Sequence, residues 1–313
     1  MIRRTFLATT AALAAAAAAA TAASAATGSP THTHATAPTR FVEAGGVRFA
    51  YRRFGRPGSQ PPLVLLMHFI GNMDNWDPTI TDGFAREREV ILFDNTGVGA
   101  TSGSVPDSIE QMSRDAASFV TALGLSQIDL LGFSMGGLLA QQVAIDHPQL
   151  VRRLILVGTG PRSGEGMAAQ TAESQAVFSA QYEHPDDLWL AVFFTQSPES
   201  QAAGRAFLKR FRARIEGRDI EVDGAKVAPA QLSAIATWGA PKPDPYAYLR
   251  AVQQPTLVVN GDHDIIIQTI NSLILKDNIP NAHLVIYPDA SHGSLFQYPD
   301  RFLRDSTMFL NRT

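Results

Sequence analysis

Six apolar runs, most of them separated by helical patterns, restrict the possible folds of this 313-residue chain more than any other feature. Short, mainly apolar runs are typical of parallel strands that are buried on both faces of a sheet. The six runs are Leu63–Phe69, Val90–Asp94, Ile128–Phe133, Leu154–Gly158, Thr256–Gly261 and Leu284–Pro288. A preceding segment, Val47–Phe54, alternates apolar and basic side chains, which predicts an early antiparallel strand.

Helical patterns lie between most of these runs, and they cover Ser108–Leu123, Met135–Asp146, Gln268–Asn278 and Asp300–Phe309. Strands that alternate with helices favour an architecture in which helices cover both faces of a mostly parallel sheet. We therefore predict an α/β fold whose core is formed by residues 41–160 and 251–313.

The interval between the strand that ends at Gly158 and the strand that begins at Thr256 is far longer than an ordinary crossover connection. It contains helical patterns and no clear strand core. We interpret residues 161–250 as a helical cap inserted over the carboxyl ends of the strands. Its basic run, from Lys209 to Arg218, is interpreted as a solvated face, with binding of a substrate carboxylate as the less favoured alternative.

The first 25 residues resemble a cleaved export signal. Arg3 and Arg4 are followed by an alanine-rich run and by a small-residue cleavage site at Ala23–Ala25. The Arg-Arg-Thr-Phe-Leu start resembles a twin-arginine signal, which predicts a periplasmic or secreted protein. Thr and Ser interrupt the apolar run, so we expect no stable membrane anchor after cleavage. Residues 26–40, which are rich in Thr, Pro and Ser, are predicted to be a disordered leader.

Composition argues against several kinds of partner. The formal charge is −3, and no basic stripe with interleaved aromatic residues is present, so nucleic acid is not an expected partner. The chain has no cysteine, and its fold must depend on a core without disulfides. His32 and His34 have no acidic or cysteine partner nearby, and we predict no metal site. His68, at the end of an apolar run, is expected to have a structural role.

The sequence Gly-Phe-Ser-Met-Gly at Gly132–Gly136 fits the pattern G-x-S-x-G. In this pattern a sharp turn from a strand into a helix exposes the serine hydroxyl. Ser134 is therefore the candidate nucleophile, and the alternative is a serine that only caps a helix. A short motif indicates catalysis only if the rest of the chain supplies a base and an acid.

A serine is a poor nucleophile near neutral pH unless a histidine accepts its proton and a carboxylate orients that histidine. His292, in a Gly/Ser loop a few residues after the last strand, is the candidate base. Asp264 is the favoured acid, Asp262 is its rival, and Asp94 is a third possibility. The order Ser134, Asp264, His292 along the chain is the order found in α/β-hydrolases.

Residues 41–309 resemble an α/β-hydrolase, and they are most similar to the group that holds esterases, lactonases, haloperoxidase-type perhydrolases and proline iminopeptidases. The resemblance implies an enzyme that needs no cofactor. In that family the acid lies in G-x-x-D, which matches Gly261–Asp264 here and favours Asp264. The resemblance also implies an oxyanion hole formed by the backbone N–H groups of Met135 and Phe69. Because large lipases have glycines where Phe69 stands, a bulky acyl group is not expected.

Several aromatic residues are candidates for the substrate pocket. We predict that Trp76, Trp238 and Phe296 form part of its wall. The cap residues Trp189 and Phe193 belong to a group of aromatics that we expect mainly to pack, with one or two of them facing the cleft.

These patterns together predict a serine hydrolase that acts on a small to medium carboxylic ester or lactone through an acyl-enzyme. The same triad serves haloperoxidase-like perhydrolases, in which hydrogen peroxide replaces water, and proline iminopeptidase-like aminopeptidases. Both stay open as alternatives at this point. An alternative of another class is a ligand receptor that keeps the pocket but turns over little.

Overall fold

The computed structural model of the chain describes residues 32–312. The predicted signal peptide, residues 1–25, and residues 26–31 of the predicted leader lie outside the described residues. Within residues 32–312, no helix is both long enough and apolar enough to cross a membrane.

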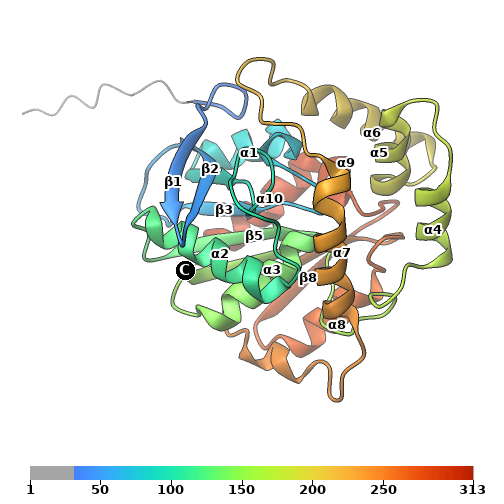
Figure 1. Cartoon of the computed structure of the whole chain (residues 1–313). Helices are drawn as coiled ribbons and strands as arrows, with labels where there is room; N and C mark the ends of the chain where they lie inside the picture. The colour runs from blue at the N-terminus through green and yellow to red at the C-terminus, as the bar shows by residue number, and fades with distance from the viewer. Residues whose placement is uncertain (1–31, 313) are drawn as a thin grey trace, which may run out of the picture. The chain divides into compact units, whose positions relative to one another are not determined.

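Eight strands form one sheet in the order β1-β2-β4-β3-β5-β6-β7-β8 (Figure 1). The strands are β1 (Arg40–Ala44), β2 (Val47–Gly55), β3 (Leu63–Leu66), β4 (Glu89–Phe93), β5 (Ile128–Phe133), β6 (Val151–Val157), β7 (Thr256–Gly261) and β8 (Ala282–Tyr287). β2 runs antiparallel to both of its neighbours, and every other pair of neighbours is parallel. The predicted α/β fold with a mostly parallel sheet is confirmed.

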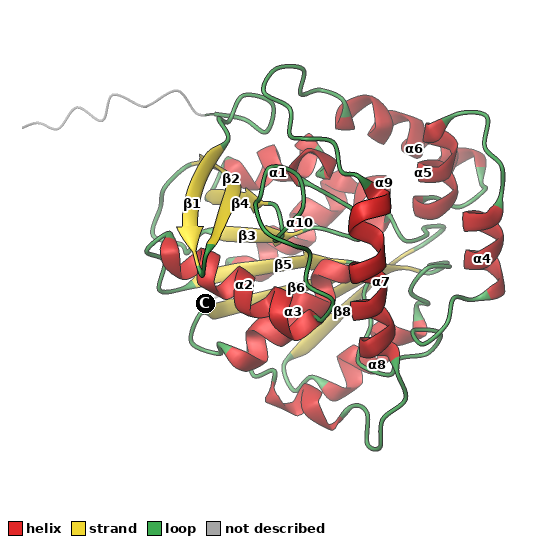
Figure 2. Cartoon of the chain, in the orientation of Figure 1, coloured by secondary structure: helices red, strands yellow, loops and turns green. Residues whose placement is uncertain are grey.

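Helices cover both faces of the sheet (Figures 1 and 2). They are α1 (Pro78–Ala85), α2 (Ile109–Ala122), α3 (Met135–Asp146), α8 (Ile270–Asn278), α9 (Ser294–Gln297) and α10 (Pro299–Leu310), with a 3₁₀ turn, η1, at Met73–Asn75. Successive side chains of a strand point to opposite faces. Leu63 and Leu65 of β3 therefore belong to a core that includes α1 and α10, whereas Val64 and Leu66 belong to a core that includes α2 and α3.

Residues 161–250, which we call the cap segment, connect β6 to β7. The segment contains α4 (Ala172–Ser179), α5 (Pro185–Phe193), α6 (Pro198–Phe211) and α7 (Gly224–Gly239), and the 3₁₀ helix η2 (Ala247–Ala251) follows at its end. Figure 2 shows α4, α5 and α6 grouped at one end of the strands. Residues of α4 and α5 can therefore meet the loops that follow the parallel strands.

Two elements carry no clear signal in the sequence. β1 lies at the edge of the sheet and its side chains are mostly exposed, so it shows no apolar run. α1 has only eight residues, which is too short for a helical repeat to stand out. Its start is nevertheless well defined, because Pro78 occupies the first turn and the Asp77 carboxylate accepts the N–H of Thr79 at 2.8 Å.

The prediction of a disordered leader is wrong for residues 32–39. His34 is buried. Its backbone N–H donates to the Asp82 carboxylate at 2.6 Å, and its backbone carbonyl accepts from Arg214 of the cap segment at 2.9 Å. Burial, followed by the nearby charge of Arg52, lowers the pKa of His34 to about 4, so this histidine is neutral. Composition cannot reveal such partners, because they come from distant parts of the chain.

The turn between β5 and α3 depends on Gly136. A Cβ at this position would overlap the carbonyl oxygen of Leu66 in β3, and a backbone oxygen inside a sheet cannot move aside. We expect Gly136→Ala to lower the free energy of unfolding by at least about 2 kcal/mol, because close-packed groups resist added volume. Urea denaturation measures the change. Gly58→Ala is the control, since a Cβ there would meet no atom closer than 4.0 Å; equal losses in both variants would contradict this explanation.

Candidate active site

Ser134 lies on the sharp turn between β5 and α3. Its φ is +56°, a value that L-residues rarely adopt, and α3 begins at the next residue, Met135. The N–H of Ser134 donates to the carbonyl of Val157 in β6 at 2.9 Å, which holds the turn at the end of the sheet. The hydroxyl makes no capping hydrogen bond to the helix. A capping role therefore does not explain this serine.

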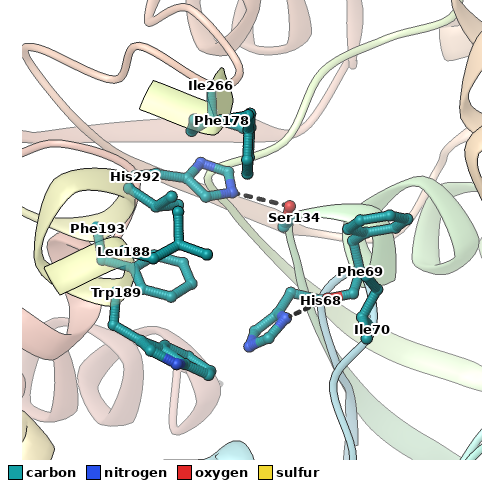
Figure 3. Close-up of a pocket in the computed structure, with 11 residues that line it drawn as sticks. His68, Phe69, Ile70, Ser134, Phe178, Leu188, Trp189, Phe193, Ile266 and His292 are labelled. Carbon is teal, nitrogen blue, oxygen red and sulfur yellow. Dashed lines mark hydrogen bonds between the residues drawn. The ribbon is translucent and has the colours of Figure 1, made fainter. Parts of the chain in front are cut away.

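His292 bridges Ser134 and Asp264. Its Nε2 lies 2.8 Å from Ser134 Oγ (Figure 3). Its Nδ1 lies 2.8 Å from Asp264 Oδ2. The other carboxylate oxygen, Oδ1, accepts the N–H groups of Ile266 and Ile267, each at 2.9 Å. Because a carboxylate oxygen only accepts, the Nδ1 proton points to Asp264, and Nε2 is left to accept the hydroxyl proton of Ser134.

The two rival acids lie elsewhere. Asp262 is 37% exposed at its side chain and interacts with His263, whose Nδ1 lies 3.0 Å from Asp262 Oδ1. Asp94 follows β4, and one of its oxygens accepts the N–H of Met73 at 2.8 Å. Asp264 alone of the three candidates contacts His292.

Asp94 instead forms a pair with Asp219 of the cap segment. One oxygen of each carboxyl group lies against Gly99, where a Cβ would overlap both. Neither oxygen has a geometric hydrogen-bond partner among the described residues. Burial, followed by the hydrogen bond and the charge of Asp219, raises the pKa of Asp94 well above its ordinary value. Folding therefore favours the protonated form of Asp94.

This pair makes stability depend on pH. In the unfolded chain the Asp94 carboxyl loses its proton near about pH 4, whereas folding retains it to higher pH, so stability falls as pH rises through the folded pKa. In Asp94→Asn an amide N–H can face Asp219, and the side chain does not titrate. We therefore expect the free energy of unfolding of this variant, relative to the wild type, to increase with pH over that range by up to about 1.4 kcal/mol per pH unit. Urea denaturation between about pH 5 and about pH 8 tests this. The exposed Asp277→Asn is the control, and a gain that does not grow with pH would contradict the assignment.

The two predicted oxyanion donors flank Ser134. Met135 is the first residue of α3, where backbone N–H groups have no acceptor within the helix. Phe69 lies in the loop that follows β3, and its side chain lines the same cavity as Ser134 (Figure 3). In the described part of the chain, neither N–H donates to a protein acceptor. Both donors are therefore available to a ligand.

A cavity of about 270 Å³ opens above Ser134. Its walls come from the loop after β3, from α4 and α5, and from the loops that follow β5, β7 and β8. The lining residues are His68, Phe69, Ile70, Ser134, Phe178, Leu188, Trp189, Val192, Phe193, Ile266 and His292. None of these eleven is an aspartate, glutamate, lysine or arginine. The cavity is therefore an apolar chamber with the Ser134–His292 pair at its floor.

The prediction for the pocket wall is corrected by the structure, because Trp76, Trp238 and Phe296 do not line this cavity. All three are buried in the cores, and Phe296 stacks on Phe207 with ring centroids 4.3 Å apart. Trp189 of α5 takes the place that they were expected to fill. An aromatic residue that follows a functional loop in sequence is thus as readily a core residue as a pocket residue.

The rings of Phe193 and His68 complete the site. Phe193 of α5 stacks on His292, with an angle of 6° between the ring planes and 5.9 Å between centroids. His68, expected to be structural, lines the cavity, and its Nδ1 donates to the carbonyl of Phe69 at 2.8 Å. Burial lowers the pKa of His68 to about 4, so its ring is neutral and adds no charge to the cavity. Across residues 32–312, no group of three His, Cys, Asp or Glu side chains is arranged to hold a metal ion.

Residues 61–299 match the alpha/beta hydrolase fold family. The chain is 29% identical over 252 residues to 2-hydroxymuconate semialdehyde hydrolase from Pseudomonas putida, and the alignment covers 79% of this chain and 86% of that protein. Both findings agree with the fold described above.

Two solved structures are also similar. An alpha/beta hydrolase fold protein from Chitinophaga pinensis is 40% identical, with a TM-score of 0.84 over 90% of this chain and 100% of that one. Est816, described as an N-acyl homoserine lactone degrading enzyme, is 27% identical, with a TM-score of 0.65 over 86% of this chain and 100% of that one. The chain therefore belongs to the alpha/beta hydrolase fold family and is an enzyme of that family.

Proposed function

We propose that the protein is a serine hydrolase that cleaves a small to medium, uncharged carboxylic ester or lactone. The observation that carries the proposal is the position of His292, whose ring nitrogens each lie 2.8 Å from a partner, Ser134 Oγ on one side and Asp264 Oδ2 on the other. This arrangement is the one that nucleophilic catalysis by serine requires.

In the proposed reaction, Ser134 Oγ attacks the carbonyl carbon of the substrate while its proton moves to His292 Nε2. The N–H groups of Phe69 and Met135 donate to the oxygen that becomes negative in the tetrahedral intermediate. His292 then gives the proton to the leaving alcohol oxygen as its bond to carbon breaks, which leaves an acyl ester on Ser134. Water, activated by the same imidazole, repeats the sequence and releases the acid.

The lining of the cavity supports the choice of an uncharged substrate. An ammonium group, as in an aminopeptidase substrate, would lose its water among these residues and find no carboxylate to pair with. A muconate, the substrate class in the name of the Pseudomonas putida relative, is a carboxylate and would find no arginine or lysine. A lactone, the substrate class in the description of Est816, carries no such charge. The volume of about 270 Å³ favours a small acyl group.

A panel of three substrates on the purified protein tests the proposal: p-nitrophenyl butyrate, a simple γ-lactone and a prolyl arylamide. We expect kcat/KM for the ester or the lactone to exceed that for the cationic arylamide by at least about 100-fold, because an unpaired buried charge is several kcal/mol unfavourable. A preference for the arylamide would overturn the proposed substrate class.

A fluorophosphonate probe separates an enzyme from a binding protein that keeps the same pocket. We expect covalent labelling at Ser134, since an activated serine attacks phosphorus as it attacks a carbonyl. Absence of both labelling and ester turnover would support the ligand receptor instead.

A further inference from the structure

The loop that carries Phe69 is a tight turn under backbone strain. The N–H of Gly71 donates to the carbonyl of His68 at 3.1 Å, which closes a four-residue turn, His68–Gly71. Inside this turn Ile70 has a φ of +57°. A β-branched residue in this left-handed region is a genuine outlier, and such strain is of the order of 1–3 kcal/mol. Something outside the turn must therefore hold it.

The peptide group between Phe69 and Ile70 is held at both ends. Its carbonyl oxygen, on Phe69, accepts the Nδ1 proton of His68 at 2.8 Å. Its N–H, on Ile70, donates to Oε1 of Gln231 at 2.8 Å. With both ends engaged, this peptide group cannot rotate without breaking two hydrogen bonds.

Gln231 reaches the turn from the cap segment. It lies on α7, the residue is 1% exposed, and 161 positions separate it from Ile70 in the sequence. The first residue of α7, Gly224, also lies close to Ile70, because a Cβ at Gly224 would be 3.8 Å from its side chain. One residue of α7 thus contacts the strained residue and a second lies close to it. Figure 3 shows Ile70 beside Phe69 and near Ser134.

We propose that Gln231 is a positioning residue for the oxyanion hole: its amide oxygen holds the strained turn so that the Phe69 N–H stays in place to meet the substrate oxygen. The inference rests on the proposed function, because it concerns the rate of the same acyl transfer. It also gives the cap segment a part in catalysis besides enclosing the cavity.

Loss of the Gln231 oxygen has a definite physical consequence. The Ile70 N–H becomes a buried donor without an acceptor, which is unfavourable by about 1–3 kcal/mol, in addition to the strain at its φ. Rotation of the Phe69–Ile70 peptide relieves both. That rotation also opens the turn that Gly71 closes by donating to the His68 carbonyl at 3.1 Å. This carbonyl and the Phe69 N–H belong to the same peptide group, so the N–H loses a contact that holds it in place. A displacement of about 1 Å in a catalytic group is enough to slow a reaction by about 100-fold.

Gln231→Met tests the inference, because methionine has a similar length and no amide oxygen. We expect kcat for p-nitrophenyl butyrate to fall by about 10- to 100-fold while KM stays within about threefold, since an oxyanion contact acts mainly in the transition state. Affinity for an alkyl boronic acid, which forms a tetrahedral adduct on serine, is expected to weaken by a similar factor. Gln201→Met is the matched control: it removes a cap glutamine that donates to the Thr195 carbonyl at 2.8 Å, far from the turn in sequence.

Two further variants distinguish positioning from general damage to the fold. Gln231→Glu keeps an oxygen acceptor at the same distance along the side chain, and we expect it to restore most of the lost kcat. Ile70→Gly removes the strain, because glycine adopts positive φ freely. We therefore expect the effect of Gln231→Met on kcat to be smaller in the Ile70→Gly background than with isoleucine, because only the unpaired N–H at position 70 then favours the rotation, as coupled sites show in a double-mutant cycle.

The outcomes separate this inference from the proposed function. If wild-type protein hydrolyses the ester and Ser134→Ala does not, but Gln231→Met keeps the kcat of Gln201→Met, the inference alone is overturned. An equal effect of Gln231→Met with isoleucine or glycine at position 70 overturns it as well. If wild-type protein is inactive on esters and lactones, or Ser134→Ala is as active as the wild type, the proposed function fails, and the inference fails with it.

Discussion

Ser134→Ala is expected to lower kcat for ester hydrolysis by between about 10⁴- and 10⁶-fold, because no other group at the floor of the cavity can form the acyl-enzyme. The residual rate comes from the Phe69 and Met135 N–H groups acting on attack by water. KM is expected to change little, since the lost oxygen atom contributes little to ground-state binding. Steady-state kinetics with p-nitrophenyl butyrate, at enzyme concentrations high enough to detect the residual rate, measure both constants.

Ser134→Gly gives an independent view of the same residue. Activity is expected to be lost as in Ser134→Ala, but glycine adopts the φ of +56° without strain. We therefore expect the glycine variant to be about 1 kcal/mol more stable than the alanine variant in urea denaturation. Activity in either variant within about tenfold of the wild type would reject Ser134 as the nucleophile. Stability equal in the two variants would show that the turn stores no strain at this position.

The parts of the site that sequence predicts are those fixed by local backbone geometry. The turn at Ser134 needs glycine on both sides, because Cβ atoms at Gly132 and Gly136 would overlap neighbouring backbone. Parallel strands end on the same edge of a sheet, so the residues that follow β5, β7 and β8 approach one another wherever they stand in the chain. Strand order along the sequence is therefore enough to bring Ser134, Asp264 and His292 together as candidates.

The parts that sequence does not predict depend on contacts between distant segments. The run Leu63–Phe69 looks like one strand, yet β3 ends at Leu66, and the residues after it turn over the edge of the sheet to line the cavity. The hydrogen bond between Ile70 and Gln231 joins this loop to α7 of the cap segment, and no local pattern marks either partner. The prediction for the pocket wall is wrong for the same reason, because the sequence does not show which distant residues surround Trp76, Trp238 and Phe296 in the cores.

Asp264→Asn is expected to lower kcat by about 10³- to 10⁴-fold through a change of tautomer in His292. Two backbone donors, the N–H groups of Ile266 and Ile267, both point to Oδ1 of Asp264 at 2.9 Å. In the variant only the amide oxygen can accept these two bonds, so the amide NH₂ must face His292. Its ring then accepts at Nδ1 and carries its proton on Nε2, toward Ser134, where it cannot accept the hydroxyl proton.

Asp262→Asn is the matched control, because it changes the neighbouring aspartate of the same loop in the same way. Its carboxylate faces His263 and the N–H of Ala290 near the surface, not His292. We expect its kcat to stay within about threefold of the wild type, as is usual for substitutions that leave the reacting groups untouched. Comparable losses in both variants would indicate that the loop responds as a whole. A large loss in Asp262→Asn, with Asp264→Asn unaffected, would contradict the assignment of Asp264. It would identify Asp262 as the acid that orients His292.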